Sequence, residues 1–538
     1  MVGCERRRSN RLFLWTGDDL MKMEKQLVTG WAGVVVLLTS LRLVGTNPTT
    51  YGWFGGLAVL TVVLVAWQIT RVLASWRGDN LTVKATWWLV WRHWWRWGLA
   101  MAWLTLLTLP FGLWGLSSRL LVRLRLPVTL INFVGLHRHV LGGIAIMGYL
   151  VLAIAGGYYL PRFLRRIAPY PLPPCQKGWW RSGWWGIGGG FLGLFTAELL
   201  VGVAWWSGSR LPESFGRPMT VGLAFLIWTV LSTVGVWLFI GVLRLAGGQP
   251  AAFGSPWRLP DWRLLILLIL TGGLNAWQAV NQQPQFMATA IISHRGVDAG
   301  HGVQNTLGAL RHVSKQRPAY VEMDLHETKD RHWVVLHDEN LQQLTQRSVM
   351  PHDLTLKQLQ RLVVRENGYR DHLVGWETYL RAAEAKHQRL LVEMKTTPQD
   401  TPHMIQRFAS QYGQRLIHDH DAVHSLDYRV VTRLKQKVPR LPVGYITPFN
   451  WVSPRSVPAD FYSFQRISLS QEFILAAAQQ RINTYVWTPD TSVAMARMWA
   501  LGTNGQITNE ASRLRWVVHQ PVATQRWAVL QNFVLSYI

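Results

Sequence analysis

Long apolar runs separated by short basic or polar segments fill the first half of the chain. Each run has about 17–25 residues, the length that an α-helix needs to cross the hydrocarbon core of a bilayer. The pattern therefore predicts an α-helical polytopic membrane domain with about seven transmembrane helices. The seven runs are Leu27–Val44, Trp53–Val72, Trp97–Leu116, Val140–Leu160, Trp185–Trp206, Val221–Leu245 and Leu264–Val280.

After a short polar link, Gln278–Gln285, short strand-like segments alternate with helical patterns. Eight such units within about 230 residues predict an α/β fold of the (β/α)8 TIM-barrel type. His332–His337 is expected to pair with the second strand as a hairpin. The predicted strands are Ala288–His294, Tyr320–His326, Leu390–Lys395, Ala422–Asp427, Pro442–Thr447, Tyr462–Ser468, Asn483–Thr488 and Gln506–Asn509. Helices predicted between them include Leu307–Gln316, Trp376–Lys386, His403–Gln411 and Gln471–Gln480.

These patterns divide the chain into a basic N-terminus (1–25), a membrane domain (26–283) and a barrel domain (284–538). The segments Trp87–Trp97 and Leu120–Leu136 are candidates for an eighth span, although arginines interrupt both, and Leu120–Leu136 is also typical of an interfacial helix. Because lysine and arginine gather in segments on the side of the N-terminus, the positive-inside rule places that end in the cytosol. Seven crossings then place the barrel on the extracytoplasmic side of the cell membrane, whereas an even number would reverse its side.

Charge and cysteine content narrow the class of protein. The formal net charge is +26 although only 16% of residues are charged. Many of the cations lie between apolar runs, so they indicate membrane topology, and we find no nucleic-acid-binding motif. Tryptophans cluster at the ends of the apolar runs, as in the aromatic belts of membrane proteins. The two cysteines, Cys4 and Cys175, fall on the predicted cytosolic side, so no structural disulfide is expected.

The densest candidate chemistry lies between Ile291 and Asp338. His294 and Arg295 end the first predicted strand, and His337 follows the hairpin strand. Glu322 and Asp324 are two residues apart in a strand and therefore point to one face. Two carboxylates on one face repel each other, and a divalent cation is a common partner for them. Histidines nearby can transfer protons close to neutral pH.

The motifs HRG, QNT, E-x-D and HD follow one another in this stretch, beginning at His294, Gln304, Glu322 and His337. In this order they resemble the glycerophosphodiester phosphodiesterase family, including members with an N-terminal multi-span domain. The resemblance extends over roughly Ala288 to Glu510. Further along the chain it includes LLVEMK with Glu393 and Lys395, HSLD with Ser425, VWTPD with Trp487, and the final motif Gly502–Asn509.

The resemblance implies metal-dependent hydrolysis of glycerophosphodiesters to an alcohol and sn-glycerol 3-phosphate. The implied general acid and base are His294 and His337, in either order. The implied substrate-binding residues are Arg295, Lys395 and Trp487. The implied metal ligands are Glu322, Asp324 and Glu393, whose oxygens suit Ca²⁺ in preference to Mg²⁺. Two alternatives stay open, namely an ion pair between Glu393 and Lys395 and a purely structural Trp487.

Three positions depart from the family pattern. Gln304 replaces a glutamate, and Asn504 and Asn509 replace aspartates, so we expect altered metal affinity or substrate range rather than inactivity. Because the three implied ligands and both histidines are retained, the enzyme is the favoured interpretation. The alternatives are a phospholipase D-like barrel that acts on intact lipids and a membrane receptor that binds glycerophosphate ligands without turnover.

Overall fold

A computed structural model describes residues 17–44, 50–75, 82–108, 116, 127–137, 140–152, 179–208, 210, 213–247, 262–281, 285–449, 452–454 and 456–537. Both cysteines, residues 1–16, the distal parts of the spans predicted at 97–116 and 140–160, and residues 282–284 of the predicted link lie outside these ranges. The chain forms two compact units, which we describe separately. A helical unit comprises residues 1–119, 142–281 and 530–538, and a barrel unit comprises residues 120–141 and 282–529.

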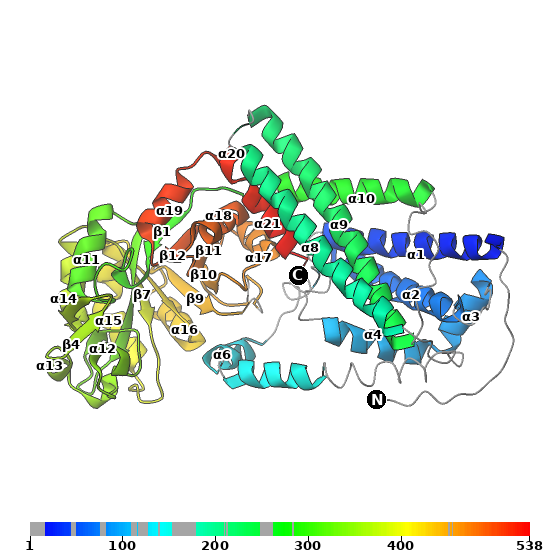
Figure 1. Ribbon diagram of the computed structural model, residues 1–538. Coiled ribbons are helices and arrows are strands. Elements are labelled where there is room, and N and C mark those ends of the chain that lie inside the picture. The colour runs from blue at the N-terminus through cyan, green and yellow to red at the C-terminus, as the bar shows by residue number, and fades with distance from the viewer. Residues whose placement is uncertain are drawn as a thin grey trace. The chain divides into compact units, whose positions relative to one another are not determined.

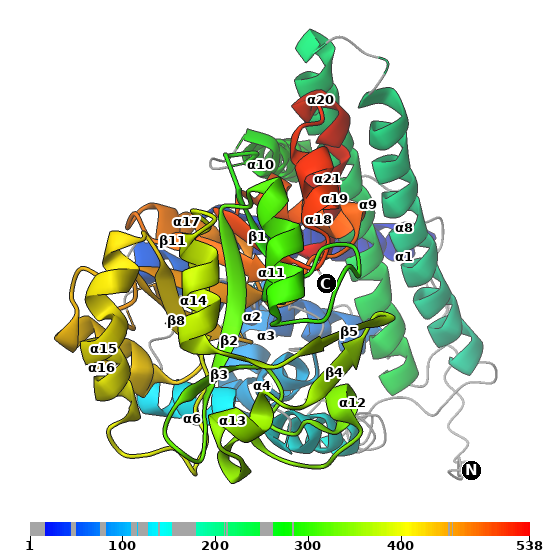
Figure 2. The same ribbon diagram turned by 90° about the vertical axis from the view of Figure 1, so that its left-hand side faces the viewer.

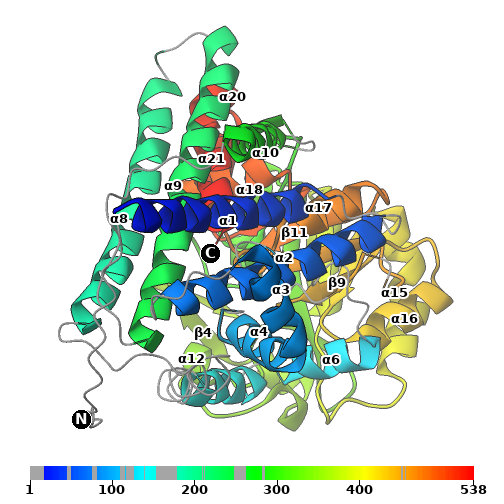
Figure 3. The ribbon, with the colours of Figure 1, turned by 90° about the vertical axis from the view of Figure 1, so that its right-hand side faces the viewer.

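Long apolar helices make up the helical unit (Figures 1 and 3). Its described helices are α1 (Gly17–Leu43), α2 (Tyr51–Ser75), α3 (Val83–Arg92), α4 (Trp94–Thr108), α8 (Trp179–Gly208), α9 (Glu213–Gly247) and α10 (Trp262–Asn281). Another helical stretch is Val140–Leu152. Each of the seven predicted spans overlaps one of these helices.

Some helices of this unit have the length and apolar composition that a membrane span needs. Among the described residues, three helical segments are long and apolar enough to cross a membrane: Tyr51–Val72, Ser214–Val236 and Trp262–Asn281. Three other apolar stretches are shorter in the part that is described: Val28–Leu43, Val140–Leu152 and Leu192–Ser207. The predicted count of seven crossings stays a prediction.

Some glycines lie at close contacts between neighbouring helices of this unit. A Cβ atom at Gly30 of α1 would overlap Gln68 of α2, and one at Gly193 of α8 would overlap Val234 of α9. Without side chains at these positions the helix backbones can approach each other, which is how apolar helices commonly associate in a bilayer.

The last residues of the chain belong to the helical unit. The Asn275 side chain on α10 donates a hydrogen bond to the Tyr537 hydroxyl, at 2.9 Å. The guanidinium of Arg42, near the end of α1, lies 3.8 Å from the centre of the Tyr537 ring and donates to the Ser536 carbonyl. The second halves of α1 and α10 thus meet the same residue, so these two helices run in the same direction.

The barrel unit is a closed ring of eight parallel strands (Figure 2). The ring runs β1 (Ala290–Ser293), β12 (Gly505–Thr508), β11 (Asn483–Trp487), β10 (Phe461–Gln465), β9 (Val443–Thr447), β8 (Ala422–Ser425), β7 (Leu390–Met394) and β2 (Tyr320–Glu327). Pairing of Ile292 with Tyr320 closes it. Each strand overlaps a predicted one and begins and ends within three residues of it, so the predicted TIM-barrel class is confirmed.

Helices cover the outside of the ring. They are α11 (Leu307–Val313), α14 (Trp376–Glu384), α15 (Met404–His418), α16 (Tyr428–Lys437), α17 (Gln471–Ala478), α18 (Ser492–Leu501) and α19 (Ala511–Val518). Between β9 and β10, the described residues contain no helix. Buried aromatic rings such as Phe408, Trp376 and Phe473 fill the layer between helices and strands. The helix α21 (Trp527–Leu535) follows α20 (Val522–Gln525) and leads to the C-terminal residues.

An insertion lies between β2 and α14. The sequence predicted its first strand, β3, but not the rest of it. The hairpin strand β3 (Trp333–Val335) pairs antiparallel with β2, as expected, and β6 (Val374–Gly375) pairs with β3. Between them lie short helices, α12 (Gln342–Thr345) and α13 (Leu356–Leu359), and a separate hairpin of β4 (Val363–Glu366) and β5 (Tyr369–His372). A small apolar core of its own, with Leu336, Leu344 and Leu359, holds this insertion together.

Asp421 at the start of β8 makes barrel stability depend on pH. Burial raises the pKa of Asp421 to about 8, although its carboxylate accepts a 2.6 Å hydrogen bond from the Leu390 amide. A raised folded-state pKa favours folding below the unfolded value of about 3.9, and this contribution is lost as pH rises toward 8. Between pH 5 and pH 8, the ionisation of Asp421 should lower the free energy of unfolding by about 2–4 kcal/mol. We therefore expect the unfolding temperature of Asp421→Asn to fall less over this range than that of the wild type. An equal pH dependence in variant and wild type would contradict this.

Candidate active site

Side chains inside the barrel follow a strict alternation along the strands. A layer of buried apolar residues closes the interior, with Ile292, Leu391, Ala422, Phe461, Tyr485 and Ile507 as its members. Because every second residue of a strand points to the same side, the residue two positions later also faces inward, nearer the carboxyl end. Those positions are His294, Glu393, His424, Ser463, Trp487 and Asn509. The barrel therefore collects polar groups at the strand ends where TIM-barrel enzymes bind substrates.

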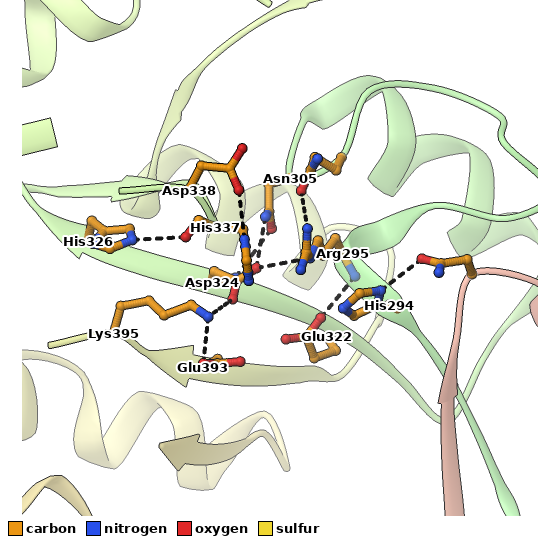
Figure 4. A network of polar contacts seen from close by, with 12 residues as sticks. His294, Arg295, Asn305, Glu322, Asp324, His326, His337, Asp338, Glu393 and Lys395 are labelled. Atoms are coloured by element: carbon orange, nitrogen blue, oxygen red, sulfur yellow. Dashed lines mark hydrogen bonds and ion pairs between the residues drawn. The ribbon is translucent and has the colours of Figure 1, made fainter. Parts of the chain in front are cut away.

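Arg295 reaches into this polar layer from an unusual backbone conformation. Its φ is 53°, in the left-handed region that residues other than glycine adopt at a cost. In this conformation the Arg295 amide donates to the Glu322 carboxylate at 2.9 Å. The guanidinium donates to Gln304 at 2.6 Å and lies 3.7 Å from Asp324 (Figure 4). The predicted phosphate-binding arginine is thus fixed at both ends.

The QNT triplet positions three different parts of the site. The Gln304 side chain accepts from Arg295 and donates to the Glu366 carboxylate at 2.7 Å. Asn305 donates to Asp324 at 3.0 Å. The Thr306 hydroxyl accepts the Ala309 amide and caps α11. Gln304 lacks the negative charge of the glutamate in the family pattern. A carboxylate, Glu366 of the inserted hairpin, accepts from Gln304 instead and therefore lies one hydrogen bond further from Arg295.

Asp324 is fully buried among cations. Its oxygens lie 3.1 Å from the Lys395 ammonium and 3.7 Å from the Arg295 guanidinium. Burial opposes its ionisation, but Lys395 and other nearby cationic groups outweigh that effect and hold the pKa of Asp324 well below its usual range. Burial also opposes the charge on Lys395, and the carboxylates of Asp324 and Glu393 overcome it and raise its pKa above the ordinary value. The pair is therefore ionised at every working pH.

Carboxylates and a histidine form a potential metal-binding group. Ligand atoms of Glu322, Glu393 and His424 all lie within 4.8 Å of one another. Burial and Asp324 oppose ionisation of Glu322, but the neighbouring His424 and His294 keep its pKa below the usual value. Of the three predicted ligands, two belong to this group, while Asp324 lies beside it and pairs with Lys395.

The position of Lys395 is compatible with both roles that the sequence left open, as a partner of Glu393 and as a substrate-binding residue. Its ammonium lies 2.6 Å from Glu393, so the ion pair weighed as an alternative does form (Figure 4). The same ammonium is also directed at Asp324, and its side chain is 16% exposed. It therefore lies between the two carboxylates and lines the cavity, where it can reach an anionic group.

The two predicted catalytic histidines have partners of different charge. His294 Nδ1 lies 2.8 Å from the Asn509 amide oxygen, and burial lowers the pKa of His294 despite the nearby Glu322. His337 Nδ1 lies 2.8 Å from the Asp338 carboxylate, which is ionised because the hydrogen bond from His337 lowers its pKa. Both rings border the carboxylate cluster (Figure 4).

His326 and Trp487 make hydrogen bonds to backbone carbonyls at the edge of the site. His326 lies behind His337, and its Nε2 is 3.1 Å from the His337 carbonyl oxygen. Burial lowers the pKa of His326 to about 4, so this ring is neutral and donates the bond. Trp487, the predicted pocket residue, donates from its indole to the Ser463 carbonyl at 3.3 Å and packs on the apolar layer.

A cavity of about 800 Å³ opens beside these groups. His337, Glu393 and Lys395 line one part of it, and Arg429 and Arg433 of α16 line another. His137 also lines it and follows α6 (Val128–Leu136), a helix from the segment predicted to be interfacial. Ile131 of α6 is buried in the main apolar core of the barrel unit. The segment between predicted spans three and four thus supplies part of the cavity wall.

The other two departures have distinct surroundings. The amide oxygen of Asn509 accepts a hydrogen bond from His294 Nδ1, and its amide nitrogen donates to Asp490 at 2.8 Å. Asn504 lies at the opposite end of β12, where its side chain accepts the Thr484 amide at 2.8 Å. Asn504 therefore supports a turn, whereas Asn509 acts directly on a predicted catalytic residue.

Sequence reasoning missed His424, Glu366 and the role of Asn305. His424 could have been found, because it precedes the matched Ser425 and lies two residues after Ala422 in a predicted strand. Asn305 belongs to the QNT triplet that was recognised. Glu366 carried no signal, since it comes from a hairpin 62 residues after its partner Gln304.

The family profile and two of the relatives that match this chain carry the same activity in their names. Residues 294–513 match the sequence profile of the Glycerophosphoryl diester phosphodiesterase family. One relative is YhdW of Bacillus subtilis (strain 168), which is named as a glycerophosphodiester phosphodiesterase. It is 27% identical over 230 residues, and the match covers 41% of this chain and 93% of that protein. A glycerophosphodiester phosphodiesterase of Caldanaerobacter subterraneus subsp. tengcongensis is 22% identical, covering 42% and 97%.

A solved structure of a glycerophosphodiester phosphodiesterase from Parabacteroides distasonis is also similar. It is 23% identical with a TM-score of 0.38, and the match covers 43% of this chain and 97% of that chain. The family match at residues 294–513 lies within the barrel unit, and the matches to these relatives each cover 41–43% of the chain. The resemblance of the first half to multi-span family members stays a prediction.

Proposed function

Because residues 294–513 form a domain of the glycerophosphoryl diester phosphodiesterase family, a family of phosphoric diester hydrolases, we propose that this chain hydrolyses glycerophosphodiesters at a membrane surface. The products are an alcohol and sn-glycerol 3-phosphate, and a divalent cation assists the reaction. The observation that carries the proposal is the convergence of two histidines, two cations and three carboxylates at the carboxyl ends of the barrel strands (Figure 4).

The acidic groups suit a divalent cation. Glu322, Asp324 and Glu393 would hold it, since Glu322 and Glu393 already bring oxygens close together and Asp324 adjoins them. When bound, such a cation offsets the negative charge that develops on the phosphate oxygens and lowers the pKa of a coordinated hydroxyl. With three carboxylates as the ligands, we expect Ca²⁺ in preference to Mg²⁺.

Arg295 and Lys395 would clamp the phosphate. Arg295 can donate two parallel hydrogen bonds to it, and the contacts with Gln304 and Asp324 orient its guanidinium beforehand. Lys395 supplies a compact positive charge at the cavity wall. Trp487 would form an apolar side of the same pocket.

The partners of the two histidines suggest which is base and which is acid. If His294 Nδ1 donates to the Asn509 amide oxygen, Nε2 is left with a free lone pair, and burial keeps the ring neutral. It can then accept the proton of the attacking water or glycerol hydroxyl. His337 faces the Asp338 carboxylate, which stabilises the imidazolium, so it can donate a proton to the oxygen of the departing alcohol.

The pH profile tests this assignment. In Asn509→Asp a carboxylate replaces the neutral amide beside His294 and stabilises its protonated form. We expect the acidic limb of the kcat/KM profile to move up by about one pH unit. Movement of the alkaline limb in Asn509→Asp would mean that the two roles are reversed.

Hydrolysis by the full-length chain in detergent tests the function itself. Glycerophosphocholine, glycerophosphoethanolamine and glycerophosphoglycerol are supplied with Ca²⁺, Mg²⁺ or a chelator, and released sn-glycerol 3-phosphate is measured. We expect release that stops with chelator. Vesicles of intact phospholipid form a second arm, and cleavage there alone would favour the phospholipase D-like alternative. Binding of glycerophosphate without any release would favour the receptor.

We also propose that the barrel lies on the extracytoplasmic side. The parallel directions of α1 and α10, which meet at Tyr537, support an odd number of crossings between the N-terminus and the barrel. Protease added to intact cells should therefore cleave the barrel but spare a tag at the N-terminus. The reverse pattern would place the barrel in the cytosol.

A further inference from the structure

His424 is a buried histidine that none of the steps above uses. It lies at the third position of β8, two residues after Ala422 of the apolar layer, and its side chain is 2% exposed. Its Nδ1 lies 3.1 Å from the Ser463 hydroxyl. Its Nε2 is buried and makes no hydrogen bond in the described structure, although a polar atom buried without a partner is costly.

The unpartnered nitrogen is directed at two carboxylates. His424 Nε2 lies 3.9 Å from a Glu322 oxygen, which is too long for a hydrogen bond. Together with Glu393, the three side chains place one ligand atom each within 4.8 Å of the others. Ligands at about 2.1 Å from one cation are separated by at most about 4.2 Å, so only small side-chain movements are required.

We propose that His424 Nε2 is a metal ligand and that the cation is therefore held by nitrogen as well as by carboxylate oxygen. The inference rests on the proposed function, whose cation it defines further. Imidazole binds Ca²⁺ and Mg²⁺ poorly and Zn²⁺ well, and Mn²⁺, which also accepts carboxylate ligands, lies between them. The site consequently prefers Mn²⁺ or Zn²⁺ to the Ca²⁺ expected from carboxylates alone.

Ser463 fixes the ring in the orientation that this role needs. When Nδ1–H donates to the Ser463 hydroxyl, the lone pair of Nε2 points toward the carboxylates, the arrangement usual for histidine ligands. The competing arrangement has Ser463 donating to Nδ1 and Nε2–H turned toward Glu322. His424 would then position Glu322 without touching the cation, and the experiment below distinguishes the two.

Mn²⁺ bound to the full-length wild type in detergent gives a direct readout. Pulsed electron paramagnetic resonance should detect coupling to an imidazole ¹⁴N nucleus, and that coupling should be lost in His424→Gln. Ser463→Ala retains the imidazole and should keep the coupling. Absence of ¹⁴N coupling in wild-type protein that binds Mn²⁺, or its persistence in His424→Gln, would overturn the proposal even if the variants were unstable.

Affinity supplies the second readout. Titration should show wild type binding Mn²⁺ and Zn²⁺ more tightly than Ca²⁺, and His424→Gln losing about tenfold or more for the first two ions with little change for Ca²⁺. Tighter binding of Ca²⁺ by the wild type would overturn the proposal. Neither readout depends on turnover, so nitrogen coupling without hydrolysis would refute the proposed function alone, and hydrolysis without nitrogen coupling would refute this inference alone.

Discussion

His294→Ala and His337→Ala are each expected to lower kcat on a glycerophosphodiester by about 10²–10⁴-fold while the barrel stays folded. The reason is that each ring transfers a proton in the proposed reaction. His294 is held by Asn509, and His337 by Asp338, both at 2.8 Å. Rates and unfolding temperatures of the purified variants provide the measurement.

His332→Ala is the matched control for both variants. It removes an exposed imidazole from the turn before β3, at a position that matches no family motif, so kcat should be unchanged. KM should change little in His294→Ala, because proton transfer rather than ground-state binding is removed. Near-normal turnover by either alanine variant would refute its assigned role.

Lys395→Met is expected to destabilise the barrel by about 3–5 kcal/mol in addition to abolishing activity. The substitution leaves the carboxylate of Asp324, which is 0% exposed, without its 3.1 Å partner, and Glu393 loses the same cation. Breaking one side of a buried ion pair is costly because the remaining charge has no solvent to stabilise it. Thermal unfolding of the full-length protein, at several pH values, measures the loss.

A double-mutant cycle separates the ion pair from packing. Asp324→Asn together with Lys395→Met removes both charges, so the double variant should be more stable than Lys395→Met alone. Arg381→Ala breaks a surface pair with Glu377, whose side chains are 71% and 41% exposed, and should cost less than about 0.5 kcal/mol. If the double variant were less stable than either single one, the charge pair would not be the cause.

Gln304 and Asn509, which replace acidic residues of the family pattern, both make hydrogen bonds to residues of the candidate site. Gln304 still orients Arg295, and it connects this residue to Glu366 at 2.7 Å. Asn509 still accepts at His294 Nδ1, but without a charge. Both positions therefore retain their geometry while the local charge is altered. This favours a working site with changed proton and metal affinities over a receptor derived from an inactive enzyme.

The eight strands and most site residues could be predicted from the sequence because their signals are local. Apolar runs of strand length define the barrel strands, and period-two alternation places His294, Glu322 and Glu393 on the inner face. Since parallel strands end at one edge of a barrel, the sequence also predicts that these residues lie together. In the first half, run length and Trp placement suffice for helices, but not for their number of crossings.

Tertiary structure decided the contacts that join distant parts of the chain. Glu366 meets Gln304 through an inserted hairpin, and Tyr537 returns to α1 and α10. None of these pairs has a periodic or local signal. Their partners are chosen by which backbones pack side by side, and that choice depends on burying the apolar faces of the whole chain at once.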